Sequence, residues 1–480
     1  MNKSSELSLK DKIGISLLIF GIFYLIIMAY IAFTIPSVWW DEVFTIAIVQ
    51  APIKDMISLG SLDVHPLLYY FIFKIIARLF NYNNIIFIGK FVSMIPYFIL
   101  TIFAITKFRK EFDWLTTGIF VLCLASMPQL MLYGTMMRMY SWALLFVTLS
   151  VYYAYKLIKN PSYKNLIIFT ILSIASCYTH YFSAVATVII YLIILVYSIK
   201  SNKTLIKKWL ISVFIGIISY LPWLIILYGQ LSSVHNDFWI PNITFQSIIT
   251  YIYFVVSPNT ALLKGPETLE PSILGSIFLI ALIALIIYSL YKKLDNLKFS
   301  IFSISIIILS TVVGIIVSLI FKPVFIYRYT VPMLGAFYLG VAVLLSSTFN
   351  INKKIFYPIL AIILIIGLIS TANFIEIQDQ EYPTFYNERQ LYRNLITVDS
   401  VCIHEKVSIY VKFKFAYTPY CEHILLQDNF VDSIIDLINN PEYKNKPIYY
   451  IEYSKNTTDL LIDSGVNLTH IMGHVYRIEH

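Results

Sequence analysis

The chain has 480 residues, of which 59% are hydrophobic and only 13% are charged. Apolar runs of about twenty residues, the length that crosses a bilayer, recur along it. This composition excludes a string of ordinary soluble domains, and a closed β-barrel would show short alternating segments instead. The net charge of +8 lies mainly in short loops, as the positive-inside rule produces, so it does not predict a nucleic-acid partner.

The apolar runs predict a polytopic α-helical membrane protein with about 11–13 transmembrane helices. The first run has no small-residue cleavage site, which favours a retained helix over a removed signal peptide. The segments are predicted at 12–34, 64–82, 85–106, 114–132, 140–158, 165–179, 182–198, 209–229, 271–290, 299–321, 325–346 and 355–373.

Lysine and arginine predict the orientation of these segments. The N-terminus and the basic clusters at 200–208 and 292–298 are predicted to be cytoplasmic, which places 230–270, Tyr327–Tyr329 and the C-terminal tail outside. Seven segments precede residue 200, although two cytoplasmic loops require an even number of crossings. We therefore expect an interfacial or re-entrant piece within 64–106; the alternative is that one basic cluster departs from the positive-inside rule, which is statistical.

Two domains are predicted. Residues 1–373 form the transmembrane module, with a first external loop at about 35–64, and residues 374–480 form a small extracytoplasmic α/β domain. In the tail, 401–404 and 446–453 resemble strands, and 428–438 has helical spacing behind the candidate cap Asp428.

The four cysteines fall into two pairs. Cys123 and Cys177 lie in apolar runs and are interpreted as small core residues. Cys402 and Cys421 lie in the tail and are able to form a disulfide if the tail is extracytoplasmic, but the sequence does not say whether they are close enough to pair.

Candidate functional residues first appear where the first apolar run meets water. Asp41 and Glu42 follow two tryptophans there, either as a solvated interfacial pair or as carboxylates held next to apolar surface and suited to accept a proton. Asp63 and His65 precede Pro66 at the start of the next run. Asp63 is interpreted equally well as a helix cap, whereas His65 is able to donate to phosphate, bind a metal or shuttle a proton.

Further candidates interrupt later apolar runs. Arg138 is either a snorkelling anchor or a bidentate grip on a phosphate or carboxylate, and the same alternatives hold for Arg328. His180 lies in a short break within more than thirty apolar residues, which is either a tight turn or a functional position. The predicted set of substrate-binding residues is Asp63, His65, Arg138, Tyr140, His180, Tyr181, Arg328 and Tyr329.

The inferred topology puts these acids, cations and hydroxyl groups at one face of the bilayer. Carboxylates that accept protons, together with cations that hold phosphate, indicate group transfer from an anionic lipid. Asp41 and Glu42 are the predicted catalytic residues.

These strings, in this order, resemble bacterial members of glycosyltransferase family 39, the protein O-mannosyltransferase-like group with the GT-C fold. The similarity covers about residues 12–346 and is carried by Trp-Trp-Asp-Glu, Asp-Val-His-Pro-Leu-Leu-Tyr-Tyr, Arg-Met-Tyr, Tyr-Thr-His-Tyr and Arg-Tyr-Thr-Val-Pro. Leu67 departs from the second proline that members often have after His-Pro, and Lys90 from a common arginine.

The resemblance implies a polyprenyl-phosphate sugar donor, transfer on the outer face of the cell membrane, and Asp41 as the base of an inverting displacement. Glu42 shares the base role, holds Asp41 in place or helps to bind a divalent metal. Metal dependence stays open because no ligand set is specific enough. The acceptor is a protein, a lipid or a glycan.

Two rival functions are considered. A transporter or lipid flippase would also have many helices, but it predicts ionisable residues near mid-membrane and two symmetric halves, which the sequence does not display clearly. A glycan polymerase or ligase would use a similar lipid-linked donor, but it would usually have a larger external loop than 230–270.

Overall fold

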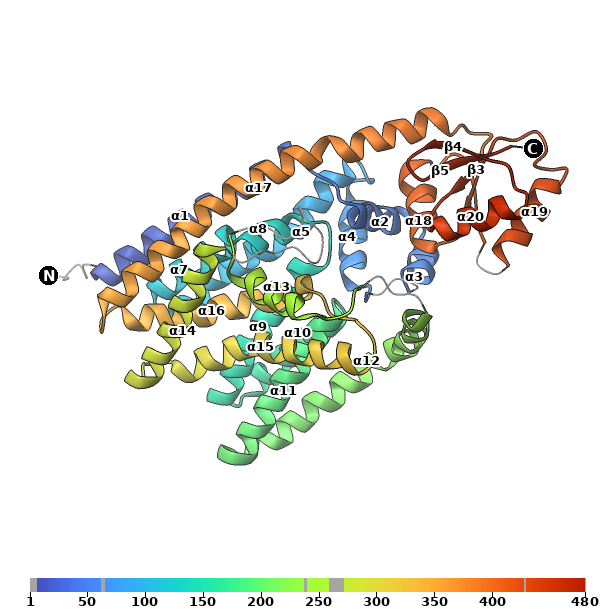
Figure 1. Ribbon diagram of the computed structural model, residues 1–480. Coiled ribbons are helices and arrows are strands. Elements are labelled where there is room, and N and C mark those ends of the chain that lie inside the picture. The colour runs from blue at the N-terminus through green and yellow to red at the C-terminus, as the bar shows by residue number, and fades with distance from the viewer. Residues whose placement is uncertain (1–6, 62–64, 237–239, 259–271, 427–428, 480) are drawn as a thin grey trace. The chain divides into compact units, whose positions relative to one another are not determined.

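The computed structural model describes residues 7–61, 65–236, 240–258, 272–426 and 429–479 (Figure 1). The chain divides into two compact units. Unit 1 comprises Met1–Pro36, His65–Tyr69 and Lys90–Asp379, and unit 2 comprises Ser37–Val64, Tyr70–Gly89 and Gln380–His480. Three helices cross a unit boundary: α4 (Leu68–Leu79), α5 (Ile85–Phe103) and α17 (Lys353–Leu395).

Within the described residues, all regular secondary structure of unit 1 is helical. Besides most of α5 and α17, it contains η1 (Ala104–Phe108), η3 (Tyr327–Thr330), α1 (Leu9–Thr34), α6 (Arg109–Glu111), α7 (Trp114–Ser126), α8 (Pro128–Thr135), α9 (Tyr140–Lys159), α10 (Tyr163–Cys177), α11 (Tyr181–Ser201), α12 (Thr204–Asn236), α13 (Phe245–Val256), α14 (Ile273–Lys292), α15 (Leu297–Ile320) and α16 (Val331–Thr348).

Within the described residues, nine helices are long and apolar enough to cross a membrane. Helices α7 and α8 are bent by 63° relative to each other, and counting them as one span gives up to ten. The polytopic helical class is therefore confirmed. The number is below the 11–13 expected because the run at 114–132 bends, and because α4 and α10 have only 12 and 15 residues. At 1.5 Å per residue, α4 spans about 18 Å, which is short of the ~30 Å hydrocarbon core.

Helix α16 forms the centre of unit 1. It packs against α7, α9 and α15. Of the most apolar 18-residue stretch within Tyr327–Thr348, 94% is buried. Helix α12 is the opposite case, because only 11% of its most apolar 18-residue stretch is buried and Ile225 is 79% exposed. Such apolar exposure is expected of a helix that faces lipid.

Helices α1 and α7 lie side by side and approach closely through glycines (Figure 1). A Cβ at Gly14 would collide with the backbone of Trp114, and one at Gly118 would collide with the carbonyl oxygen of Gly14. Small residues of this kind let membrane helices pack backbone to backbone.

We expect Gly118→Leu to lower the stability of the protein by about 1–3 kcal/mol, because the added side chain must push α1 away from α7. Thermal unfolding in detergent measures the effect. Gly216→Leu is the matched control, since a Cβ at Gly216 meets nothing within 4 Å. Equal melting temperatures for the two variants would contradict the close crossing.

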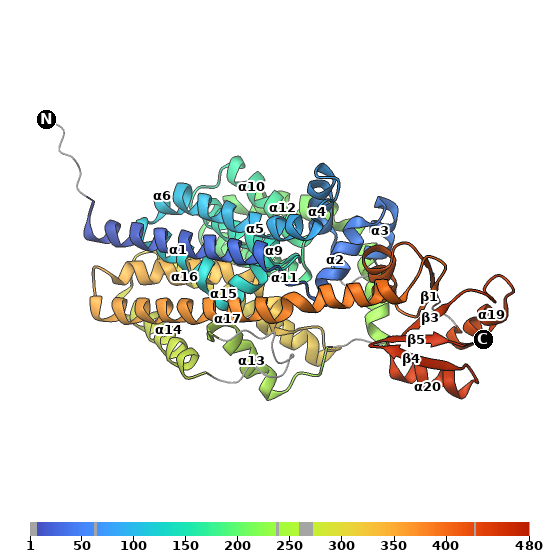
Figure 2. The same cartoon turned by 90° about the horizontal axis from the view of Figure 1, so that it is seen from above.

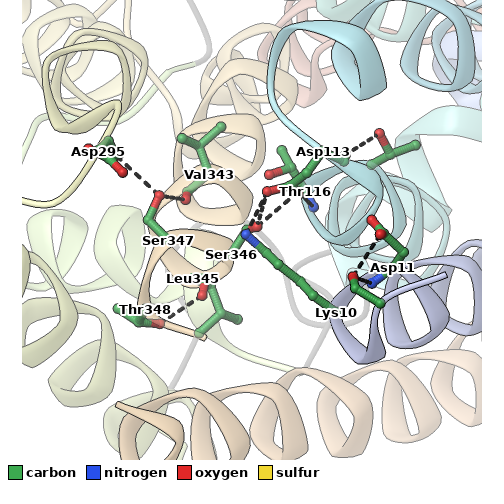
Figure 3. A network of polar contacts seen from close by, with 12 residues as sticks. Lys10, Asp11, Asp113, Thr116, Asp295, Val343, Leu345, Ser346, Ser347 and Thr348 are labelled. Atoms are coloured by element: carbon green, nitrogen blue, oxygen red, sulfur yellow. Dashed lines mark hydrogen bonds and ion pairs between the residues drawn. The ribbon is translucent and has the colours of Figure 1, made fainter. Parts of the chain in front are cut away.

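A polar network links the N-terminal ends of α1 and α7 to the C-terminal end of α16 (Figure 3). Asp113 accepts the Thr116 amide at 2.6 Å as the N-cap of α7, and it pairs with Lys10 at 2.7 Å. Ser346 donates to the same carboxylate. Burial raises the pKa of Asp113, but the hydrogen bonds from Lys10 and Thr116 outweigh this effect and keep the pKa below its usual value.

Unit 2 combines helices with one sheet. Its helices are α2 (Trp40–Gln50), α3 (Ile53–Ser61), α18 (Val407–Lys412), η4 (Phe413–Tyr417), α19 (Phe430–Asn439) and α20 (Lys455–Asp463), together with most of α4 and the end of α17. The strands are β1 (Val401–His404), β2 (Glu422–Leu425), β3 (Ile448–Ile451), β4 (Leu468–Met472) and β5 (Val475–Ile478).

The sheet has the order β2-β1-β3-β5-β4. Strands β2, β1 and β3 are parallel, and β5 and β4 add an antiparallel hairpin at one edge, as Figure 2 shows for β1, β3, β5 and β4. One face of the sheet packs Ile403, Ile448 and Tyr450 against Ile434 of α19 and Leu461 of α20.

The predicted strands at 401–404 and 446–453 are confirmed as β1 and β3. The predicted helix at 428–438 is found as α19, which begins after Asn429, while the candidate cap Asp428 lies outside the described residues. Residues 37–61 and 70–89 join the unit that contains the C-terminal tail rather than the bundle. Helix α2 packs on α18 and η4, and Lys412 Nζ lies 3.4 Å from the centre of the Trp40 ring.

Candidate functional site

Four of the predicted site residues converge in unit 1, each next to the start of a helix. His65 precedes α4, Arg138 precedes α9, His180 is the N-cap of α11, and Arg328 lies in the 3₁₀ turn before α16. Arg138 and Arg328 are close enough that their charges act on both histidines. Residues separated by 263 positions in the sequence thus form a single cationic cluster.

The rings of His65 and His180 are stacked, with centroids 5.1 Å apart. Tyr329 lies edge-on to His180 at 5.1 Å, and Tyr140 lies 5.6 Å from the same ring. His65, His180 and Arg138 are all at most 5% exposed. The cluster is therefore a buried polar centre inside an apolar bundle, where ionisable groups are costly unless they serve a function.

One hydrogen bond fixes the proton on His180. Its Nδ1 accepts the Phe182 amide at 3.1 Å, so the ring proton of the neutral imidazole is on Nε2. That Nε2–H is buried and has no partner among the described atoms, and neither has Nδ1 of His65. A buried donor without a partner is costly, and a ligand oxygen would satisfy it.

Both histidines are neutral in the folded protein. Burial, followed by the charges of Arg138 and Arg328, lowers the pKa of His180 to about 3. Burial and then His180 and the two arginines lower the pKa of His65 well below its usual value. Neither imidazole is basic enough at neutral pH to deprotonate a hydroxyl group, so both are donors or positioning groups rather than bases.

These shifts predict a pH dependence of stability. The unfolded chain binds more protons than the folded chain below about pH 6.5, because the folded-state pKa values lie lower. The stabilisation from neutral burial is thus complete above that pH and declines as the pH falls, by up to roughly 1.4 kcal/mol per pH unit for each histidine.

We expect His180→Gln to flatten the decline in melting temperature between pH 7.5 and pH 5. His474→Gln, at a side chain that is 64% exposed, is the control and should leave the decline unchanged. An unaltered slope in the His180 variant would contradict neutral burial of this ring.

The tyrosines of the predicted set separate into two groups. Tyr140 and Tyr329 contact His180, whereas Tyr181 turns to α12, where its hydroxyl donates to Gln230 and accepts from Trp223 Nε1 at 3.1 Å. Tyr133 was not singled out from the sequence, yet it packs on Tyr140 at 5.0 Å and is buried. The available signal was its position in the short stretch Tyr133–Tyr140, which also contains Arg138 and lies between two apolar runs.

Lys90 is a second residue without a predicted role. This α5 side chain is 1% exposed, so unit 1 buries another cation. The sequence singled out this position only as a departure from an arginine common in the family that the chain resembles.

Asp41 and Glu42 lie in unit 2, in the first turn of α2. Glu42 is fully buried and its carboxylate accepts the Trp39 amide at 2.9 Å, which caps the helix as in a capping box. Asp41 is partly exposed. The carboxylate of Glu42 therefore stabilises the N-terminus of α2. Asp63, the third predicted acid, lies outside the described residues.

Among the described residues, no group of acids and histidines around Asp41 and Glu42 has the spacing of a metal site. The group that does have it lies in the C-terminal sheet and consists of Cys402, Cys421 and His423.

The fold defines the class: a polytopic membrane protein of the GT-C type with a small C-terminal sheet domain. Two similar solved structures are those of ArnT from Cupriavidus metallidurans, in the apo state (TM-score 0.62) and bound to undecaprenyl phosphate (TM-score 0.63). Each is 9% identical and covers 96% of this chain and 97% of the ArnT chain, so the likeness concerns the fold. No family model and no curated protein sequence matches the chain.

Proposed function

We propose that this protein is a glycosyltransferase that moves a sugar from a polyprenyl-phosphate carrier to a hydroxyl group of an extracytoplasmic acceptor. The observation that carries the proposal is the buried cluster of two arginines and two neutral histidines in unit 1. A fold like that of ArnT, which has been solved with undecaprenyl phosphate, supports a polyprenyl-phosphate ligand.

The chemistry of the cluster suits a lipid phosphate. Arginine presents a planar fork of donors that matches phosphate oxygens, and the Nε2–H of His180 adds a neutral donor. During transfer the bond between the anomeric carbon and the phosphate oxygen breaks, and the lipid phosphate leaves as an anion. Fixed positive charge stabilises that developing anion, and a buried site strengthens the effect.

The acceptor hydroxyl must lose a proton as the new glycosidic bond forms. Because the two histidines are neutral weak bases, a carboxylate is the better candidate, and we assign this role to Asp41. Direct displacement by the hydroxyl inverts the anomeric centre. Glu42, which caps α2, is assigned the role of holding Asp41 in place.

The finer assignments follow from the sequence. The strings at Trp39–Glu42 and 63–70 support membership of glycosyltransferase family 39, and the lysine distribution supports a multi-pass protein of the cell membrane with its site and C-terminal domain outside. The donor sugar is a hexose or a pentose, and the acceptor is a protein, a lipid or a glycan.

The test uses the purified full-length chain in detergent with a panel of polyprenyl-phosphate hexoses and pentoses. We expect undecaprenyl phosphate to bind and to compete with the active donor, whereas undecaprenol, which lacks the phosphate, should bind far more weakly. Free polyprenyl phosphate and glycosylated acceptor should appear together. Equal binding of the two lipids, or lipid translocation with the sugar–phosphate bond intact, would contradict the proposal.

A further inference from the structure

A Cys-x-His motif occurs on each of two neighbouring strands of the C-terminal sheet. Strand β1 carries Cys402 and His404, Cys421 is the residue immediately before β2, and His423 is the second residue of β2. The strands are parallel, with Cys402 opposite His423 in the register. Because side chains alternate between the faces of a strand, all four lie on the same face.

This face is the one opposite the hydrophobic core of the sheet. Ile403, between the two motif residues of β1, packs into that core. His404 is fully buried on the other side, where its ring lies 5.6 Å from Phe413 and 5.7 Å from Tyr410. The four side chains are thus held between the sheet and the α18–η4 segment.

The distances between the sulfur and nitrogen atoms are those of metal ligands. The sulfurs of Cys402 and Cys421 are 3.8 Å apart, and Cys421 Sγ lies 3.2 Å from His423 Nε2. Two thiolates bound to zinc at about 2.3 Å in a tetrahedron are separated by about 3.8 Å, whereas a disulfide requires about 2.05 Å. Both cysteines are free in the structure.

A second histidine orients the first. His423 Nδ1 lies 3.0 Å from His404 Nε2, and the two rings are stacked at 5.3 Å. Metal-bound histidines usually donate their other ring N–H to a carboxylate, a backbone carbonyl or water. Here the Nε2 of His404 is in place to accept it, which would leave the Nε2 of His423 free to bind the metal. Nδ1 of His404 is buried without a partner among the described atoms.

We propose that Cys402, Cys421 and His423 bind one thiophilic divalent cation, with zinc the best match, and that His404 is the positioning residue for His423. The three protein ligands leave one tetrahedral position for water. Without a metal, His423 Nε2–H donates to the Thr418 carbonyl oxygen at 2.8 Å, and the cation would replace this contact. Two thiolates and one imidazole suit zinc rather than magnesium or calcium, which prefer oxygen.

Binding requires both sulfurs to be thiolates. The cation therefore replaces the thiol protons of Cys402 and Cys421, which pass to solvent. The proton of His423 resides on Nδ1, toward His404, when Nε2 is the ligand.

The metal would act as a staple. Strand β2 is the edge of the sheet, has four residues and is only partly buried. Bridging it to β1 would fix this edge and the turn after η4, as metals commonly do in small domains. This role is separate from the cationic cluster of unit 1, so it stands or falls independently of the proposed transferase activity.

The test is a titration of the purified, fully reduced chain in detergent with cobalt(II), combined with elemental analysis for zinc. We expect one zinc per chain after expression in zinc-containing medium, and a thiolate-to-cobalt charge-transfer band that saturates at one equivalent. Chelation should lower the melting temperature, and zinc should restore it.

Cys421→Ser and His423→Gln should each weaken cobalt binding by at least 10-fold, and Cys177→Ser, at a free cysteine of α10, should leave it unchanged. His404→Phe should retain the charge-transfer band but bind more weakly. Circular dichroism verifies that each variant folds. Absence of stoichiometric binding by the reduced wild-type chain, unchanged binding by both ligand variants, or isolation of the chain with a Cys402–Cys421 disulfide would overturn the proposal.

Discussion

Arg138→Gln is expected to reduce the affinity of the protein for undecaprenyl phosphate by at least 30-fold. Removing one partner of a buried, hydrogen-bonded charge pair typically costs about 2–5 kcal/mol, and each 1.4 kcal/mol is about a factor of ten. Arg138 is only 5% exposed, so water cannot replace the lost interaction easily. Binding of undecaprenol should change little, because that lipid has no phosphate.

The control must distinguish a lost contact from a damaged fold. Arg109→Gln removes another arginine of unit 1, which stacks on Trp114 with its guanidinium 4.7 Å from the ring. This variant should bind both lipids normally. Arg328→Gln should weaken phosphate binding in the same direction as Arg138→Gln. If both cluster variants fold and bind undecaprenyl phosphate like the wild type, the cationic cluster is not a phosphate site.

Asp41→Asn is expected to reduce the rate of sugar transfer by about 10²–10⁴-fold while donor binding remains normal. A general base contributes a factor of this size, and the amide keeps the shape of the side chain but cannot accept the proton. The neutral histidines of unit 1 offer no replacement base. The effect should therefore appear in kcat, measured as release of polyprenyl phosphate at saturating donor.

Two variants delimit this result. Asp55→Asn removes a carboxylate from the first turn of α3 and should retain transfer. Glu42→Gln keeps an oxygen able to accept the Trp39 amide, so α2 should remain capped and only a direct chemical role of Glu42 would be lost. Near-normal transfer by Asp41→Asn would remove Asp41 from the mechanism.

Local patterns account for what could be predicted. Apolar runs of bilayer length identified the helical membrane class, and β-branched and aromatic residues identified β1 and β3. Four site residues were recognised because a charged or polar group within an apolar run is energetically unfavourable unless it serves a function. They are His65, Arg138, His180 and Arg328. The Trp-Trp-Asp-Glu string identified Asp41 and Glu42 as candidate residues, but it was placed in an external loop at about 35–64, so neither α2 nor the bond by which Glu42 caps it was predicted.

Other features depended on contacts that no local pattern encodes. The run at 114–132 has uniform hydropathy, yet it bends between α7 and α8. Tyr140 and Tyr181 carry the same chemistry next to candidate residues, but only Tyr140 faces His180. Residues 37–61 join the C-terminal unit because α2 packs on α18 and η4, which are more than 340 positions further along the chain.

The sequence by itself determined that this is a membrane protein of many helices with a C-terminal α/β region. It also identified four polar residues whose burial in apolar surroundings is energetically unfavourable. Composition and periodicity suffice for this because they reflect which residues are buried. The tertiary structure decided which of those residues meet. It placed two arginines beside two stacked, buried histidines, so that burial and the neighbouring charges keep both rings neutral, and it aligned two Cys-x-His motifs through the register of β1 and β2. Strand pairing and helix packing bring distant residues together, and their chemistry depends on that proximity and on burial.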